Sequence, residues 1–142
     1  YYEEIKGYCL SLMKHYPLEF QWIIEPGGGM VESAVNFVCR VENLKKKDNI
    51  NYVYINGGIS EGMQVKHGAI KNLTNSQVTR WRNIYVFFDT TCLHQRLFIY
   101  ADRMVIEYQD ILLFERCGAY TTCYINRFHA KRPPQMYNVN ED

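Results

Sequence analysis

Residues 35–42, with the sequence Val-Asn-Phe-Val-Cys-Arg-Val-Glu, mark a change in the periodicity of this chain. Apolar and polar side chains alternate here, with Val35, Phe37, Cys39 and Val41 set against Asn36, Arg40 and Glu42. Successive side chains of a strand point to opposite faces, so this period of two predicts a half-buried β-strand.

The sequence before this stretch has a helical period instead. Apolar residues recur at helical spacing, and Pro17 ends the pattern: Ile5, Tyr8, Cys9, Leu12, Met13 and Tyr16. A short apolar run at residues 20–24 reads as one strand. We therefore predict one amphipathic helix and one strand at the start of the chain.

Further strand-like runs follow residue 42 at 52–55, 84–88, 97–100, 104–106, 111–114 and 120–125. Turn-forming residues separate most of them, at 47–49, 57–58, 72–76, 101–102 and 117–118. The sequence also supplies 12 Tyr and 7 Phe for packing. These features predict a mainly β fold, an antiparallel Greek-key-like sandwich or barrel.

Composition limits the function classes. The 142 residues carry 16 Lys and Arg against 15 Asp and Glu, and the one basic run, at 45–47, is followed by Asp48. We expect neither nucleic-acid nor membrane binding. The five cysteines form no C-x-x-C pair, and the histidines have no partners at metal-ligand spacing, so we expect no disulfide framework, no metal and a cytoplasmic location.

A glycine run follows the first predicted strand, in the sequence Glu25-Pro26-Gly27-Gly28-Gly29. Glycines reach positive φ without strain, and they let backbone amides converge on an anion such as a phosphate. Glu25 adds a carboxylate at the end of the strand. A cofactor that carries a phosphate and a basic ring nitrogen would satisfy both groups.

This loop and three later segments together resemble the C-terminal region of the fold-type III pyridoxal-phosphate decarboxylases, which include the ornithine, diaminopimelate and arginine decarboxylases. The other segments are Asp110 to Thr121, with Leu-Phe-Glu and Gly-Ala-Tyr-Thr, then Asn56-Gly57-Gly58-Ile59, then Thr90-Thr91-Cys92. The resemblance covers nearly the whole chain. The glycine loop and the segment at 110–121 are its most specific parts.

The resemblance implies two parts in the chain. Residues 1–30 would be the last helix, strand and phosphate loop of a (β/α)8 barrel, and residues 31–142 would be the C-terminal β domain. The chain opens without Met inside a predicted helix, so we expect a fragment. In such enzymes the lysine that forms the Schiff base lies in the early barrel, and we expect this piece alone to be inactive.

The resemblance also implies roles in binding pyridoxal 5'-phosphate. Glu25 would keep the pyridine nitrogen protonated, Gly27 and Gly28 would cradle the phosphate, and Tyr120 would donate its phenol to that phosphate. These enzymes usually have Arg where this chain has Gly28. Backbone donors would then replace a bidentate guanidinium.

Cys92 matches a cysteine that relatives contribute across the interface of a homodimer, where it helps to protonate the substrate Cα. A thiol suits that task because its pKa lies within reach of neutrality. We therefore expect Cys92 to be catalytic and the active sites to lie at the subunit interface.

The substrate would be an amino acid, and the resemblance places Gly57, Leu93, His94 and Ile125 near it. Ornithine decarboxylase has Asp at the positions of Gly57 and Leu93, where the two acids receive the distal ammonium. An ammonium without them would be buried unpaired, so ornithine is disfavoured. His94, Gln95 and Arg96 would meet an acidic or amide side chain, or else form a solvated turn.

Two other functions stay open. A non-catalytic homologue would keep the β domain as a protein-binding or regulatory module. Gly28, Gly57 and Leu93 favour it, because they replace the Arg and the two Asp described above. A racemase-type or siderophore-pathway enzyme would use the same scaffold for a different reaction. The retained Glu25, Cys92 and Tyr120 favour the decarboxylase.

Overall fold

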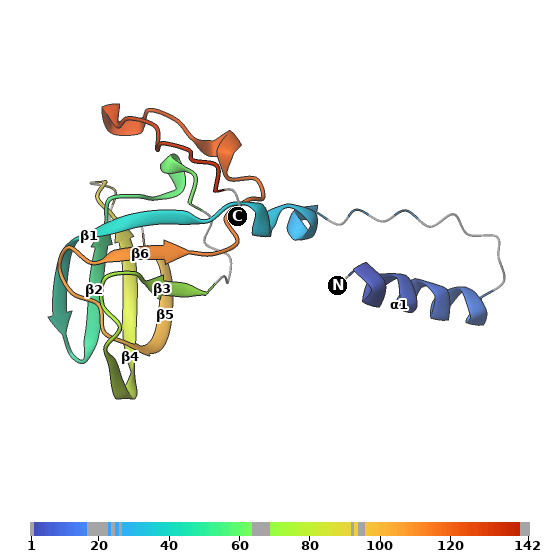
Figure 1. The fold of residues 1–142 in the computed structure, drawn as a ribbon, viewed down its shortest axis with the longest axis horizontal. Coiled ribbons are helices and arrows are strands. Elements are labelled where there is room, and N and C mark those ends of the chain that lie inside the picture. The colour runs from blue at the N-terminus through green and yellow to red at the C-terminus, as the bar shows by residue number, and fades with distance from the viewer. Residues whose placement is uncertain are drawn as a thin grey trace.

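The computed structural model describes residues 2–16, 23, 25, 27–63, 69–91, 93 and 96–139. One α-helix, α1 (Tyr2–His15), is followed by six strands: β1 (Phe37–Lys47), β2 (Ile50–Ile55), β3 (Ile70–Asn72), β4 (Val78–Asp89), β5 (Arg96–Met104) and β6 (Ile111–Phe114). The helix lies apart from the strands (Figure 1). No described helix is long and apolar enough to cross a membrane.

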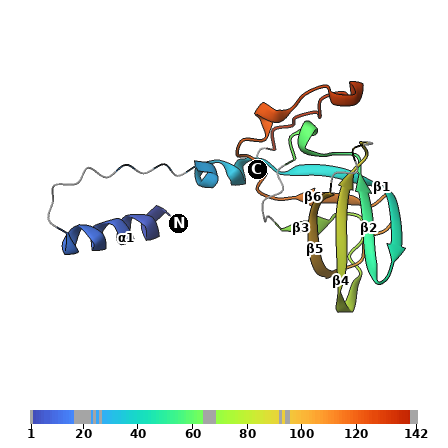
Figure 2. The ribbon, with the colours of Figure 1, turned by 180° about the vertical axis from the view of Figure 1, so that it is seen from behind.

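The six strands form a single mixed sheet in the order β3-β6-β1-β2-β4-β5. The sheet curves into a nearly closed barrel (Figure 2). All neighbouring strands are antiparallel except β2 and β4, which run parallel with Ile55 opposite Asp89. The predicted mainly β, barrel-like domain is confirmed, and this one parallel pair is the departure from an antiparallel sheet.

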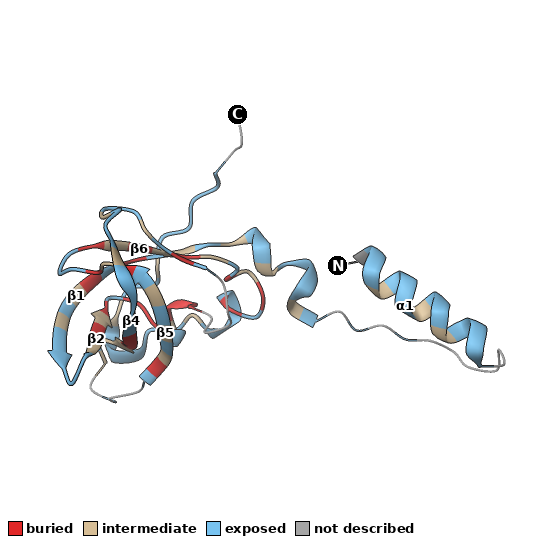
Figure 3. Cartoon of the chain, turned by 90° about the horizontal axis from the view of Figure 1, so that it is seen from below, coloured by how far each residue is buried: buried red, intermediate tan, exposed pale blue. Residues whose placement is uncertain are grey.

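The core lies between the inward faces of the strands. Phe87 is fully buried, and its ring stacks on Phe98 at 4.7 Å and meets the edge of Phe114 at 5.8 Å between centroids. Val41, Val53, Ile55 and Leu112 are also fully buried. Buried residues gather on the strands, whereas α1 is exposed along most of its length (Figure 3).

The turn predicted after residue 47 is present. Asp48 and Asn49 both have positive φ, 50° and 63°, and join β1 to β2 as a tight hairpin. Such turns suit Asp and Asn because their side chains tolerate the left-handed region. The amphipathic helix and the strand at 111–114 are confirmed as well.

One expected strand break and one expected strand are wrong. Residues 101–102 do not break the strand, because Ala101 pairs with Ile84 and Asp102 with Asn83 on the long strand β4, so β5 continues to Met104. Residues 120–125 are not a strand. Tyr120 has φ of 61°, which turns the chain out of the extended region, and a 3₁₀ turn at Thr122–Tyr124 follows. The strand expected at 20–24 falls mostly outside the described residues.

Candidate functional site

The glycine run folds into a short 3₁₀ turn, Gly27–Met30, and a second one follows at Glu32–Ala34. Gly27 has φ of 55°, a conformation that favours glycine. Gly28 is needed for a different reason. A Cβ at its position would lie 2.9 Å from the Cβ of Ala119, closer than carbon atoms normally approach.

The segment after β6 packs against this loop. The amide of Cys117 donates to the carbonyl of Val35 at 2.7 Å, and the amide of Gly118 donates to the carbonyl of Glu32 at 2.8 Å. Pairing of β1 with β6, which places Phe37 opposite Phe114, brings the two segments together. Two parts of the predicted cofactor site that are far apart in sequence are therefore neighbours.

Tyr120 stands over the glycine loop. Its hydroxyl oxygen is 3.5 Å from the point at which a Cβ of Gly27 would stand. Its ring carbon Cε2 is 3.7 Å from the point at which a Cβ of Gly28 would stand. The side chain remains more than half exposed. The phenol can therefore reach a ligand at the loop, as the phosphate-binding prediction requires.

Glu25 is exposed, and residues 24 and 26 on either side of it lie outside the described part of the chain. Its proposed contact with a pyridine nitrogen stays a prediction. Cys92 and His94 also fall outside the described residues, and their predicted roles stay predictions too. Leu93 is described and is well exposed.

The parallel pairing of β2 and β4 sets the loops after both strands side by side. Gly57 and Gly58 follow β2, and Thr90 and Thr91 follow β4. A Cβ at Gly57 would lie 2.5 Å from the ring of Phe37, so the aromatic ring already fills the space that an acidic side chain would need. Ile125 was predicted to lie near the substrate. Its Cγ1 atom lies 2.9 Å from the point at which a Cβ of Gly62 would stand.

A charged cluster at this edge was not predicted from the sequence. Lys131 Nζ lies 3.0 Å from Glu61 Oε1 and donates to Thr90 Oγ1 at 3.1 Å. Glu61 is almost fully buried, and Asp89 is close to it across Gly58. The two members of the ion pair are far apart in sequence and share no motif, so no local signal would have identified them.

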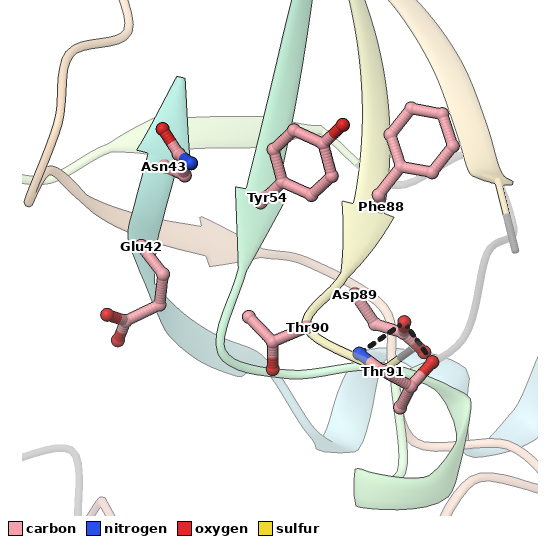
Figure 4. A pocket seen from close by; sticks show the side chains of 7 residues that line it. All are labelled: Glu42, Asn43, Tyr54, Phe88, Asp89, Thr90 and Thr91. Atoms are coloured by element: carbon pink, nitrogen blue, oxygen red, sulfur yellow. Dashed lines mark hydrogen bonds between the residues drawn. The ribbon is translucent and has the colours of Figure 1, made fainter. Parts of the chain in front are cut away.

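Asp89 also lines a shallow surface pocket of about 440 Å³. Glu42 and the stacked rings of Tyr54 and Phe88, 5.4 Å apart, form the rest of its wall together with Asn43, Thr90 and Thr91 (Figure 4). Thr91 donates from its amide and its hydroxyl to Asp89 Oδ1. The pocket leaves one side of Asp89 within reach of solvent.

One buried thiol and two phenols of the core have raised pKa values. Burial raises the pKa of the Cys39 thiol to about 12, and the nearby Cys117 adds to the shift. Burial likewise raises the pKa of Tyr85 and of Tyr100. These groups stay neutral at physiological pH and serve packing. The described residues contain no cluster of three or more His, Cys, Asp or Glu suited to a metal ion.

No protein-family profile matches the sequence, and no curated protein is similar to it in sequence. Solved structures do match its fold. The arginine decarboxylase of Paramecium bursaria Chlorella virus, bound to agmatine, has a TM-score of 0.62 at 16% identity over 73% of this chain and 30% of its own.

Two other decarboxylases match to a similar degree. The Vibrio vulnificus lysine/ornithine decarboxylase complexed with cadaverine has a TM-score of 0.62 at 17% identity, over 81% of this chain and 32% of its own. The diaminopimelate decarboxylase of M. jannaschii has a TM-score of 0.58 at 23% identity, over 75% of this chain and 25% of its own. The chain thus spans about a third or less of these proteins, and the barrel-like β fold is what it shares with them.

Proposed function

We propose that this chain is the C-terminal part of a pyridoxal-phosphate-dependent amino-acid decarboxylase. The observation that carries the proposal is the position of Tyr120 beside Gly27 and Gly28, from which it is far apart in sequence. The fold shared with three decarboxylases supports the reaction class.

The residues present fit the cofactor phosphate. The loop offers backbone amides beside a surface that has no side chain at residues 27–29, and the Tyr120 phenol is an O–H donor at the same place. Hydrogen bonds to an ionised acceptor are stronger than those between neutral groups. Tyr120 and the loop would together hold the phosphate and fix the orientation of the ring.

The chemistry divides between the cofactor and the protein. When bound, pyridoxal phosphate supplies an electron sink for the pair left when the substrate loses carbon dioxide. Glu25 would hold a proton on the ring nitrogen and so preserve that sink. Cys92 would deliver a proton to the substrate Cα in the partner subunit of a homodimer.

Binding of cofactor to the intact polypeptide tests the proposal. We expect a visible absorption band on addition of pyridoxal phosphate, and release of carbon dioxide from at least one member of a panel of carboxyl-labelled amino acids. Cys92→Ala should lower the rate of release and leave the absorption band in place. A polypeptide that stays colourless and releases no carbon dioxide would overturn the proposal and favour the regulatory homologue.

A further inference from the structure

The outer face of the barrel carries exposed apolar side chains on two neighbouring strands. Phe87 is fully buried and points inward, so the alternation of side chains along β4 turns Val86 and Ile84 outward. Ile84 pairs with Ala101 on β5, and Val86 pairs with Ile99. Ile84 is 44% exposed and Ile99 is 56% exposed. These two isoleucines and Ala101 form the apolar centre of a surface patch.

Basic side chains flank this apolar centre, and they come from distant parts of the sequence. Lys47 on β1 pairs with Ile50 on β2, which pairs in turn with Ile84. Lys45 lies two residues before Lys47, and Arg103 lies two residues after the apolar centre on β5, so both continue the same outer face. Lys45, Lys47 and Arg103 are all exposed, and we call them the basic rim.

A bulge at the start of β4 adds an exposed indole and further basic side chains. Residues 79–82 of β4 stand opposite the single residue Arg103 of β5. The Thr79 hydroxyl lies within hydrogen-bond distance of the carbonyls of Trp81 and Arg103, at 2.6 and 3.1 Å, and holds the bulge in place. Trp81 is 73% exposed, and the guanidinium of Arg80 lies 5.2 Å from the centre of its ring.

The end of the barrel that bears these residues is strongly basic. The turn between β1 and β2 and the start of β4 lie together there, at the bottom of Figure 1. Residues 45–48, 80–84 and 99–103 carry six of the 16 Lys and Arg and two of the 15 Asp and Glu. Six against two gives these segments a net charge of +4 in a chain whose net charge is +1. Charge of one sign gathered on one surface favours a partner of the opposite sign.

The residue types of the patch indicate which anionic partner fits. Guanidinium groups bind carboxylates in a bidentate manner, and Trp and Arg are enriched among the residues that dominate binding at protein interfaces. Nucleobases bind single-strand readers by stacking on aromatic rings, which an aliphatic centre of Ile84 and Ile99 does not provide. An aliphatic centre with a basic rim matches a protein segment that has apolar side chains and carboxylates.

We propose that the outer face of β4 and β5 is a docking surface for an acidic amphipathic segment of another protein. Apolar side chains of the segment lie on Ile84 and Ile99, and its carboxylates reach Lys47 and Arg103. Trp81 packs against the segment where β4 begins. The loops after β2 and β4 lie at the other end of these parallel strands, so docking does not involve the candidate cofactor site.

Binding of a short synthetic peptide to the chain tests this surface. The probe is a blocked peptide of alternating Glu and Leu, and the matched probe has Gln in place of each Glu. In ¹H–¹⁵N spectra we expect saturable shifts at the amides of Ile84 and Ile99 with the acidic peptide. The neutral peptide should bind about tenfold more weakly or worse, since several charge pairs are lost. Absence of these shifts, or equal binding of the two peptides, would overturn the docking surface.

Charge reversals locate the surface. Lys47→Glu and Arg103→Glu should each weaken binding of the acidic peptide about fivefold, because each replaces an attraction by a repulsion at an exposed position. Lys14→Glu makes the same change of charge on α1, which lies apart from the strands, and should leave the affinity nearly unchanged. Equal losses in Lys47→Glu and Lys14→Glu would show that net charge alone controls binding and would overturn the proposal.

A second pair of variants tests the apolar centre. Ile99→Thr keeps a β-branched side chain but removes apolar surface, and it should weaken binding about threefold or more. Val38→Thr is the matched control, because Val38 is 54% exposed on β1 and pairs with Leu113 on β6. An equal effect of the two variants would contradict the role given to Ile99.

Two further probes test other anionic partners. We expect the chain to bind phosphatidylserine vesicles and a short oligothymidylate more weakly than the acidic peptide at the same salt concentration. Tighter binding of either probe, lost in Lys47→Glu, would assign the surface to a membrane or a nucleic acid and overturn the proposal. None of these measurements uses pyridoxal phosphate, so their outcome is independent of the decarboxylase proposal.

Discussion

A Cβ on Gly118 would lie 2.0 Å from the carbonyl oxygen of Val31. That distance is far below van der Waals contact with a backbone atom, which cannot rotate away. Gly118 is thus a point of close approach between the segment that carries Tyr120 and Val31, which follows the glycine run. The approach is a packing requirement of the candidate phosphate site.

Gly118→Ala should separate the two segments and lower the free energy of unfolding by at least about 2 kcal/mol, as overpacking a tight contact does. Chemical denaturation of the purified chain measures the loss. Gly7→Ala is the matched control, because Gly7 lies in α1 with nothing within 4 Å of its Cβ position. Alanine favours a helix, so that variant should not be destabilised. Equal stability of the two variants would contradict the packing argument.

Tyr120→Phe should weaken the binding of pyridoxal phosphate to the intact polypeptide by about tenfold or more, since a phenol donor to the phosphate is lost while the ring is kept. Absorption titration measures the affinity. Tyr124→Phe removes an equally exposed phenol a few residues away and should have no effect. If Tyr120→Phe bound the cofactor as tightly as the unaltered protein, the role given to this phenol would be wrong.

Lys131→Met should lower the free energy of unfolding by about 3 kcal/mol, because it leaves the buried Glu61 carboxylate without its ammonium partner. The double variant with Glu61→Gln should recover part of the loss. Lys71→Met breaks an exposed pair with Glu115 and should cost about 1 kcal/mol or less. A thermal or urea melt of the four proteins makes the comparison, and a similar cost at both lysines would argue against a buried pair.

Alkaline pH should destabilise the protein through Cys39. The folded pKa is raised to about 12 from a usual value of 9.0, so the folded state holds the proton more tightly than the unfolded state. The stabilisation is complete below pH 9 and is lost as the pH rises from 9 towards 12.

The free energy of unfolding of the unaltered protein should therefore fall relative to Cys39→Ala between pH 9 and pH 11. Tyr85 and Tyr100 also have raised pKa values, but both proteins retain them, so the difference isolates the thiol. Parallel curves for the two proteins over this range would show that the burial of Cys39 does not control its titration.

Local patterns were sufficient for some elements and not for others. The strand β6 was predicted with its observed bounds, because its apolar residues are flanked by polar ones on both sides. The break expected at 101–102 was wrong because pairing with β4 overrides the low strand propensity of Ala and Asp. The short strand β3 (Ile70–Asn72) has no run of apolar residues and exists through its pairing with β6.

The candidate site was predictable only in part. The resemblance to decarboxylases, rather than periodicity, linked Tyr120 to the glycine loop. The cluster of Glu61, Asp89 and Lys131 could not be predicted, since it depends on the parallel register of β2 and β4 and on where the C-terminal segment crosses them. Interactions of this kind arise from long-range topology and leave no local pattern in the sequence.

The parallel register of β2 and β4 has a consequence for how this scaffold can diversify. The loops that follow β2 and β4 are far apart in sequence but begin at the same edge of the sheet. Insertions or exchanges in either loop would therefore change one surface, while the main-chain hydrogen bonds between the two strands stay intact. A library that varies Ile59 and Ser60 together with Thr90 and Thr91, and keeps Gly57, Gly58 and Gly62, would sample new selectivities on an unchanged frame.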